Sequence, residues 1–155
     1  MEKITESVAI GSDHAGIDTK KFIMDLLDQH NITYEDVGSF DPNVSDDYPV
    51  YAKKVSDIVI EKGIKGILVC GSGTGMAIAA NKVNGIRASF SFDEYSARMA
   101  RHDNDANVLT LRGREFPTSE IKIIVETWLS TSFSGIERHK HRIEEVHQME
   151  EDAKK

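Results

Sequence analysis

The stretch GILVCGSGTGMAIAAN, residues 66–81, predicts a buried strand, a glycine-rich turn and a helix of small residues. Its first part is continuously apolar, which is typical of a strand covered on both faces of a parallel sheet. Gly71, Gly73 and Gly75 stand at alternate positions, so backbone N–H groups can point into one concavity that attracts an anion. Cys70 precedes them, where the start of a helix favours the thiolate. The segment therefore offers an anion cradle beside a candidate base or nucleophile.

The spacing of these glycines excludes two common nucleotide-binding motifs. A dinucleotide fingerprint requires G-x-G-x-x-G, whereas this chain has G-x-G-x-G followed by Met76. A P-loop ends in glycine, lysine and a hydroxyl residue, and no lysine follows Gly75 here. A tight turn that needs glycine only for close packing is the structural alternative, and the motif by itself leaves that alternative open.

Size and charge limit the classes of protein that this chain can represent. Its 155 residues suit one domain, residues 1–155, with a C-terminal helical extension over about 136–155. The net charge of −7 disfavours binding to nucleic acid or an anionic membrane. The single cysteine excludes an internal disulfide and fits a reducing compartment. Residues 1–6 lack the apolar core of a signal peptide, and no apolar run approaches the ~20 residues of a membrane span. We expect a cytoplasmic protein.

Hydrophobic periodicity predicts strands that alternate with helices along the chain. The expected strands are residues 7–12, 32–37, the apolar part of 66–81, 86–90 and 107–111. The expected helices begin near residues 17, 50, 74, 93, 117 and 136, and residues 38–49 form a long loop. This alternation predicts an α/β fold with a parallel sheet covered on both faces. Ligands in such folds bind beyond the carboxyl ends of the strands.

Polar residues gather where the predicted strands end. Asp13 could orient a substrate hydroxyl and His14 could bind phosphate, although helix capping and a plain turn are common roles for such residues. Tyr48 could contact a sugar, although a lone loop tyrosine usually serves packing. Histidine side chains can exchange a proton near neutral pH, so a residue such as His102 could act as an acid or base, although a helix-end histidine is often only a surface residue.

The last predicted helix carries a basic pair and a thin apolar stripe. Arg138 and Arg142 are four residues apart and lie on one helical face, where a phosphate between them would relieve their repulsion. A solvated basic face is the structural alternative. Ile143, Val146 and Met149 recur every three residues, and this stripe is too narrow to anchor a core helix. Packing against a second subunit would explain it.

These groups together predict proton transfer beside a carbonyl in a phosphorylated sugar. Cys70 would be the base, and backbone N–H groups with the Ser72 hydroxyl would stabilise an enediolate. We expect no cofactor, because neither nucleotide-binding motif is present. We expect no metal, because one cysteine and scattered histidines lack a ligand spacing.

The motifs in their joint order resemble type B ribose-5-phosphate isomerases, in the family that also holds galactose- and allose-6-phosphate isomerases. The resemblance runs from about residue 8 to 146 and rests on five segments. These are GSDHAG (11–16), DYP (47–49), CGSGTGMAIAANK with GIR (70–87), NDANVL (104–109) and RHKHR (138–142).

The resemblance implies a Rossmann-like α/β/α sandwich with five parallel strands in the order 2-1-3-5-4. It also implies a homodimer, often paired into a tetramer, in which a neighbouring subunit completes each active site. Cys70 would shuttle a proton between C1 and C2, and Asp13 would handle hydroxyl protons. The remaining implied roles are enediolate binding by Ser72, Gly71, Gly73 and Gly75, sugar contact by Tyr48, and phosphate binding by His14, Arg114, Arg138 and Arg142.

The chain departs from the family pattern at one important position. The family usually has a histidine, assigned to opening the sugar ring, directly before the asparagine that matches Asn104. This chain has Asp103 there, with His102 one residue earlier. We expect His102 to reach the ring oxygen; the alternatives are that Asp103 opens the ring or that the substrate differs. Another branch of the family uses a glutamate as base where this chain has Met76, which favours Cys70. Arg112 stands where a small residue is common, and its role is open.

The expected activity is interconversion of ribose 5-phosphate and ribulose 5-phosphate within the pentose phosphate pathway. Two alternatives stay open. One is isomerisation of a six-carbon aldose phosphate, and the other is a regulator that binds a sugar phosphate without turnover. Retention of Cys70, Asp13 and Ser72 argues against the regulator, because binding alone needs no proton shuttle.

Overall fold

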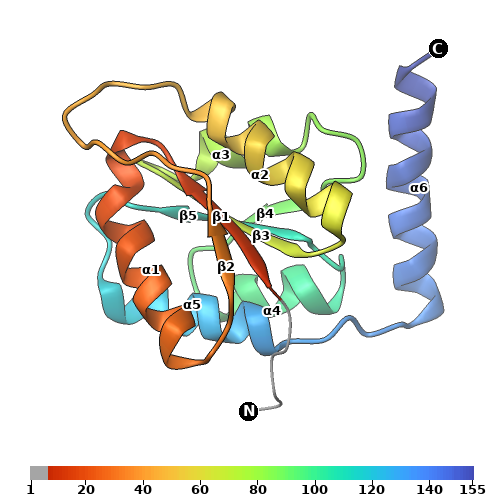
Figure 1. Cartoon of the computed structure of the whole chain (residues 1–155). Coiled ribbons are helices and arrows are strands. Elements are labelled where there is room, and N and C mark those ends of the chain that lie inside the picture. The colour runs from red at the N-terminus through yellow and green to blue at the C-terminus, as the bar shows by residue number, and fades with distance from the viewer. Residues whose placement is uncertain (1–6) are drawn as a thin grey trace.

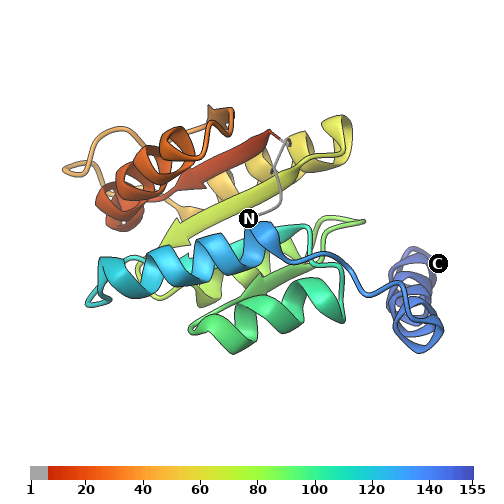
Figure 2. The ribbon, with the colours of Figure 1, turned by 90° about the horizontal axis from the view of Figure 1, so that it is seen from below.

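The computed structural model describes residues 7–155 as a five-stranded parallel sheet between two layers of helices (Figures 1 and 2). The strands are β1 (Val8–Ser12), β2 (Tyr34–Asp36), β3 (Lys65–Cys70), β4 (Ala88–Phe90) and β5 (Val108–Arg112). The helices are α1 (Ile17–Gln29), α2 (Tyr48–Lys62), α3 (Thr74–Ala80), α4 (Glu94–His102), α5 (Thr118–Ser130) and α6 (Glu137–Ala153), with a short 3-10 turn at His14–Gly16. Residues 1–6, in which no signal peptide is expected, lie outside the described residues.

The strand order β2-β1-β3-β5-β4 confirms both the α/β class and the order that the resemblance implied. Side chains alternate between the faces of the central strands. Ile67 and Val69 of β3 pack with α1, α4 and α5, whereas Leu68 and Cys70 pack with α2 and α3. The central strands are buried on both faces, which explains the continuous apolar run in β3. Cys70 thus ends its strand on the side that α3 covers.

Element ends differ from the sequence predictions by a few residues. β2 and β4 are two to three residues shorter than the predicted strands, and α2 begins at Tyr48 rather than near residue 50. Pro49 lies in the first turn of α2, where a missing N–H costs nothing and the fixed φ suits a helix. Tyr48, expected in a loop, is therefore held by a helix and points to the sheet edge where the site lies.

Helix α6 stands apart from the sandwich in both views (Figures 1 and 2). It approaches the body near Gly85, whose N–H donates to Glu150 over 3.1 Å. Val146 and Met149 of its apolar stripe are 49% and 70% exposed. The stripe is therefore largely uncovered in the single chain, as the narrow pattern predicts. No helix among the described residues is long and apolar enough to span a membrane.

Candidate active site

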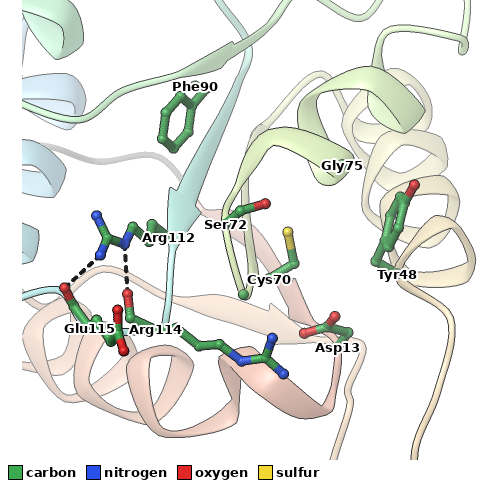
Figure 3. Close-up of a pocket in the computed structure, with 10 residues that line it drawn as sticks. Asp13, Tyr48, Cys70, Ser72, Gly75, Phe90, Arg112, Arg114 and Glu115 are labelled. Atoms are coloured by element: carbon green, nitrogen blue, oxygen red, sulfur yellow. Dashed lines mark hydrogen bonds between the residues drawn. The ribbon is translucent and has the colours of Figure 1, made fainter.

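A cavity of about 630 Å³ lies at the carboxyl ends of β1, β3 and β5 (Figure 3). β1 and β3 are hydrogen-bonded neighbours, so Asp13 directly after β1 lies beside Cys70 at the end of β3. The residues that line the cavity include Asp13, Tyr48, Cys70, Ser72, Arg112 and Arg114. Five of these were expected at the site from the sequence, as were Gly71 and Gly75, which also line it.

Cys70 presents its sulfur to this cavity although the residue is only 4% exposed. Figure 3 shows the thiol between Ser72, Tyr48 and Asp13. The backbone N–H of Gly73 donates to Sγ over 3.1 Å, which fixes the sulfur at the start of α3. The thiol is thus shielded from bulk solvent yet open to a ligand in the cavity.

The glycine turn allows two aromatic rings to lie directly against the backbone. A Cβ on Gly75 would come within 2.8 Å of the Tyr48 ring, and one on Gly73 within 2.6 Å of the Phe90 ring. Gly73 also has φ +83°, a conformation that other residues rarely adopt. Close packing therefore accounts for part of the motif, in agreement with the structural alternative. It also places the Tyr48 ring on the wall of the cavity.

Asp13 is held in an environment that favours proton exchange. The carboxylate accepts the N–H of Ala15 over 3.0 Å and caps the following turn. Burial raises the pKa of Asp13 above 3.8, and the neighbouring His14 opposes that shift. The same side chain thus caps a turn, as the structural alternative held, and faces the cavity beside Cys70.

Asp46 orients His14 and was missed by the sequence analysis. Its Oδ1 lies 2.9 Å from Nδ1 of His14 and accepts the His14 backbone N–H over 2.8 Å. The Tyr51 hydroxyl donates to its other oxygen over 2.9 Å. Because Nδ1 is engaged, Nε2 of His14 is the nitrogen left for a ligand. Burial alone would raise the pKa of Asp46, but hydrogen bonds from Ser39, His14 and Tyr51 outweigh it and lower that pKa to about 2.

Replacing Asp46 with asparagine should make the free energy of unfolding less dependent on pH in the acid range. A carboxylate whose pKa falls on folding stabilises the protein above its unfolded pKa of 3.8, and this contribution disappears as pH falls toward about 2. The difference in the free energy of unfolding between wild type and Asp46→Asn should shrink by on the order of 1–2 kcal/mol as the pH falls through this range. Urea unfolding at stepped pH measures it. Asp57→Asn, at an exposed pair with Lys53 on α2, is the matched control. A difference that is constant between pH 5 and pH 2 would contradict the assignment.

Arg114 and Arg112 form the wall that follows β5. The Arg114 side chain lies against Gly71, where a Cβ would meet its guanidinium at 3.1 Å. Arg112 donates from Nε to the Arg114 carbonyl over 2.7 Å and from Nη2 to the Glu115 carbonyl over 2.8 Å (Figure 3). Its guanidinium also lies over the Phe116 ring, 5.5 Å from the centroid. Arg112 therefore holds the loop that carries Arg114 in place. This gives a role to an arginine that stands where a small residue is common in the family.

Seven expected site residues are not among those that line the cavity of their own chain. These are His14, Gly73, His102, Asp103, Asn104, Arg138 and Arg142. The two arginines are exposed on α6, and neither has a hydrogen bond or ion pair within residues 7–155. A single chain does not bring them to Cys70.

His102 and Asp103 instead form a cluster with His139 of α6. His102 Nδ1 lies 2.7 Å from Asp103 Oδ1, and His139 Nε2 lies 3.6 Å from the same oxygen. Three ligand-type groups within 4.8 Å of one another could hold a metal ion. Two ligands of one tetrahedral zinc ion are about 3.4 Å apart, however, so the 2.7 Å contact is a hydrogen bond. The sequence analysis missed His139, because no spacing on α6 connects it with the end of α4.

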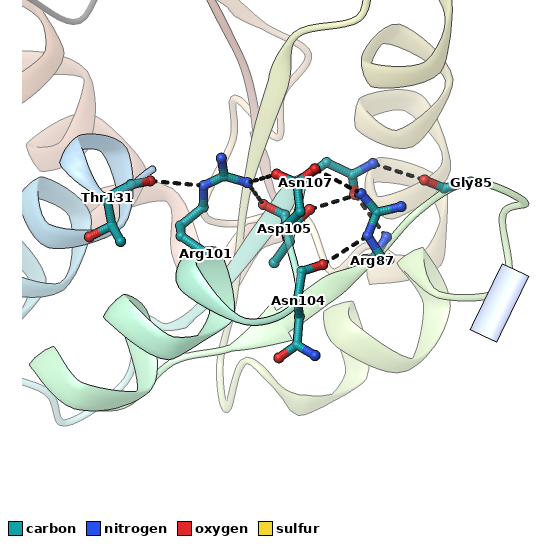
Figure 4. Close-up of polar contacts among 8 residues, drawn as sticks. Gly85, Arg87, Arg101, Asn104, Asp105, Asn107 and Thr131 are labelled. Carbon is teal, nitrogen blue, oxygen red and sulfur yellow. Dashed lines mark hydrogen bonds and ion pairs between the residues drawn. The ribbon is translucent and has the colours of Figure 1, made fainter. Parts of the chain in front are cut away.

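Two arginines hold the loop that follows this cluster (Figure 4). Arg101 donates from Nη1 to Asp105 Oδ1 over 2.8 Å and to the Ala106 carbonyl over 2.7 Å. Arg87 donates to the carbonyls of Asn104 and Asp105 over 3.0 and 2.9 Å. Asp105 has φ +45°, a left-handed conformation that is uncommon for residues other than glycine and that these bonds stabilise. The loop therefore has a fixed shape.

Residues 8–146 match the model of the family described as Ribose/Galactose Isomerase. This chain belongs to that family. "Ribose-5-P isomerase B" of Listeria innocua is 41% identical over 83% of this chain and 86% of its own length. "D-erythrulose-4-phosphate isomerase" of Pectobacterium atrosepticum is 44% identical over the same shares. The structure of ribose-5-phosphate isomerase B from Mycoplasma genitalium with bound ribulose-5-phosphate has a TM-score of 0.89 at 37% identity, covering 94% of this chain and 96% of that one. The family membership confirms the resemblance inferred from the motifs.

Proposed function

We propose that this protein is an aldose–ketose isomerase that interconverts D-ribose 5-phosphate and D-ribulose 5-phosphate without a cofactor. The observation that carries the proposal is the thiol of Cys70 in a cavity that Asp13 and Arg114 also line. The family membership and a relative's structure with bound ribulose-5-phosphate support it.

In the proposed reaction Cys70 moves a proton between the two carbons that exchange the carbonyl. The thiolate removes the proton from C2 of the open-chain aldose and returns it to C1, through an enediolate. Backbone N–H groups of Gly71, Gly73 and Gly75 and the Ser72 hydroxyl stabilise the charge on the enediolate oxygens. Asp13 exchanges the hydroxyl protons, for which its raised pKa is suited.

We propose that the active site is shared between two copies of the chain. Arg114 and His14 approach the phosphate from the chain that supplies Cys70, and Arg138 and Arg142 of the partner subunit complete the phosphate site. Two features support this arrangement. The guanidinium groups of α6 lie outside the cavity of their own chain, and the α6 stripe is uncovered. Burial of that stripe against a second chain would drive dimerisation. We place the enzyme in the cytoplasm, in carbohydrate metabolism.

A four-carbon substrate is the second candidate, and Asp103 favours it. A tetrose 4-phosphate cannot close a furanose ring, because the hydroxyl that would close it is esterified. An enzyme for such a substrate needs no ring-opening histidine, and this chain has aspartate at the family's histidine position. A relative named for D-erythrulose 4-phosphate supports this candidate.

An isomerase assay of the wild-type protein across aldose phosphates of four, five and six carbons tests the proposal. We expect kcat/KM to be highest for ribose 5-phosphate. A higher value for a tetrose 4-phosphate would support the second candidate, and one for allose or galactose 6-phosphate would move the enzyme to six-carbon substrates. Binding of these sugars with turnover of none would make the protein a regulator and overturn the proposal.

A further inference from the structure

We propose that Thr74 is a positioning residue that orients the Ser72 hydroxyl toward the charged oxygen of the enediolate. This inference rests on the isomerase activity and on the role of Ser72 proposed above. Ser72 lines the cavity (Figure 3), whereas Thr74 lies just behind it and is not among the lining residues. Thr74 would therefore act on the reaction only through its neighbour, and the sequence analysis gave it no role.

The glycine turn before α3 brings the two hydroxyl groups together. Ser72 Oγ lies 2.8 Å from Thr74 Oγ1, which is a hydrogen bond between the two side chains. Gly73 stands between them with φ +83°, so the chain turns sharply here and does not continue the extended course of β3. The same glycine donates its N–H to Cys70 Sγ over 3.1 Å. One turn therefore sets the positions of the sulfur and of the hydroxyl pair.

The Thr74 hydroxyl has no competing protein partner within residues 7–155. Its hydrogen bond with Ser72 is the only one that this side chain makes there. A threonine in a helix often bonds to the carbonyl one turn earlier, but that carbonyl belongs to Cys70 and accepts the Gly113 N–H over 2.8 Å. Thr74 also does not cap α3, because Gly73 holds the N-cap position. Its hydroxyl is therefore available to Ser72.

The charge that develops on the substrate decides which of the two hydroxyls donates. Each hydroxyl has one hydrogen to donate and can also accept. A charged oxygen is a stronger acceptor than a neutral hydroxyl, so Ser72 directs its hydrogen to the enediolate oxygen. Thr74 then donates to Ser72, and the two hydrogen bonds in series strengthen each other. The contact therefore stabilises the charged transition state more than the bound neutral sugar.

Replacing Thr74 with valine removes the hydroxyl and keeps the branched shape of the side chain. We expect kcat to fall by about three- to tenfold, while KM for ribose 5-phosphate changes by less than about twofold. Thr74→Ser keeps a hydroxyl and should stay within about twofold of the wild-type kcat. Thr118→Val makes the same change at the exposed first residue of α5 and is the matched control, with no expected loss. Initial rates over a range of substrate concentrations separate kcat from KM.

A double-mutant cycle distinguishes positioning of Ser72 from a general structural role. If Thr74 acts only through Ser72, Thr74→Val should cause no further loss of kcat in a chain that already carries Ser72→Ala. A substitution that merely loosened α3 would lower kcat by the same factor in both backgrounds, and that result would overturn the proposal.

Two further results would also overturn it. One is a wild-type kcat in Thr74→Val, and the other is a wild-type kcat in Ser72→Ala, which would remove the role on which Thr74 depends. Failure of the isomerase function itself is recognised separately, because the wild-type protein would then turn over none of the sugar phosphates. That outcome would refute this inference together with the function on which it rests.

Discussion

Turnover by Cys70→Ala should fall at least about 10³-fold in both directions, because no other group replaces the thiolate that moves the carbon-bound proton. Cys70→Ser is the conservative companion and should be impaired nearly as much, since a hydroxyl is a far weaker acid than a thiol. The initial rates with ribose 5-phosphate and ribulose 5-phosphate measure both losses.

Binding should survive the loss of the thiol. In the proposed site the phosphate and the sugar hydroxyls are bound by groups other than the sulfur, so calorimetric titration of Cys70→Ala with ribose 5-phosphate should give a Kd within a few-fold of wild type. Turnover within about tenfold of wild type would assign the proton transfer to another group. Loss of binding together with turnover would show that the substitution had disturbed the cavity itself.

The second large effect concerns the arginines of α6. The double variant Arg138→Ala/Arg142→Ala should raise KM strongly and lower kcat/KM by on the order of 10²–10³-fold, because it removes two charge-assisted contacts to the phosphate. Lys140→Ala, an exposed cation on the same helix, is the matched control. Rates across a range of ribose 5-phosphate concentrations separate KM from kcat.

Mixing two inactive variants tests whether these arginines act across a subunit boundary. In a mixed dimer of Cys70→Ala with the double arginine variant, one site carries every substitution and the other carries none. Equimolar mixing after reversible dissociation should therefore restore roughly one quarter of wild-type activity. Mixing without recovery, although mixed dimers form, would place the arginines and Cys70 in the same chain.

Patterns local in the sequence predicted most of the fold. The apolar run of β3 and the glycines after it indicated a central buried strand and a short helix, and both are present. Hydrophobic periodicity could not predict the strand order, because it indicates which segments are strands and does not indicate which strands pair with one another. The order was predicted from the family resemblance. The start of α2 at Tyr48 was missed by two residues, since Pro49 is compatible with both a loop and a first helical turn.

The candidate site was predictable where its residues follow strands and not where they meet through tertiary contacts. Asp13 and Cys70 follow adjacent parallel strands, so the topology alone brings them together. Asp46 orients His14 from 32 residues away, and His139 reaches Asp103 only because the α5–α6 connection is bonded to α4. Such pairs depend on the path of a connection, which no spacing in the sequence encodes.

The salt-bridged turn after α4 has a thermodynamic consequence for the enzyme. Hydrogen bonds from Arg87 and Arg101 fix the backbone around Asp105 when the protein folds. The neighbouring imidazole–carboxylate pair at positions 102 and 103 is therefore attached to a rigid turn. The conformational entropy of this turn is therefore lost when the protein folds and not when a ligand binds.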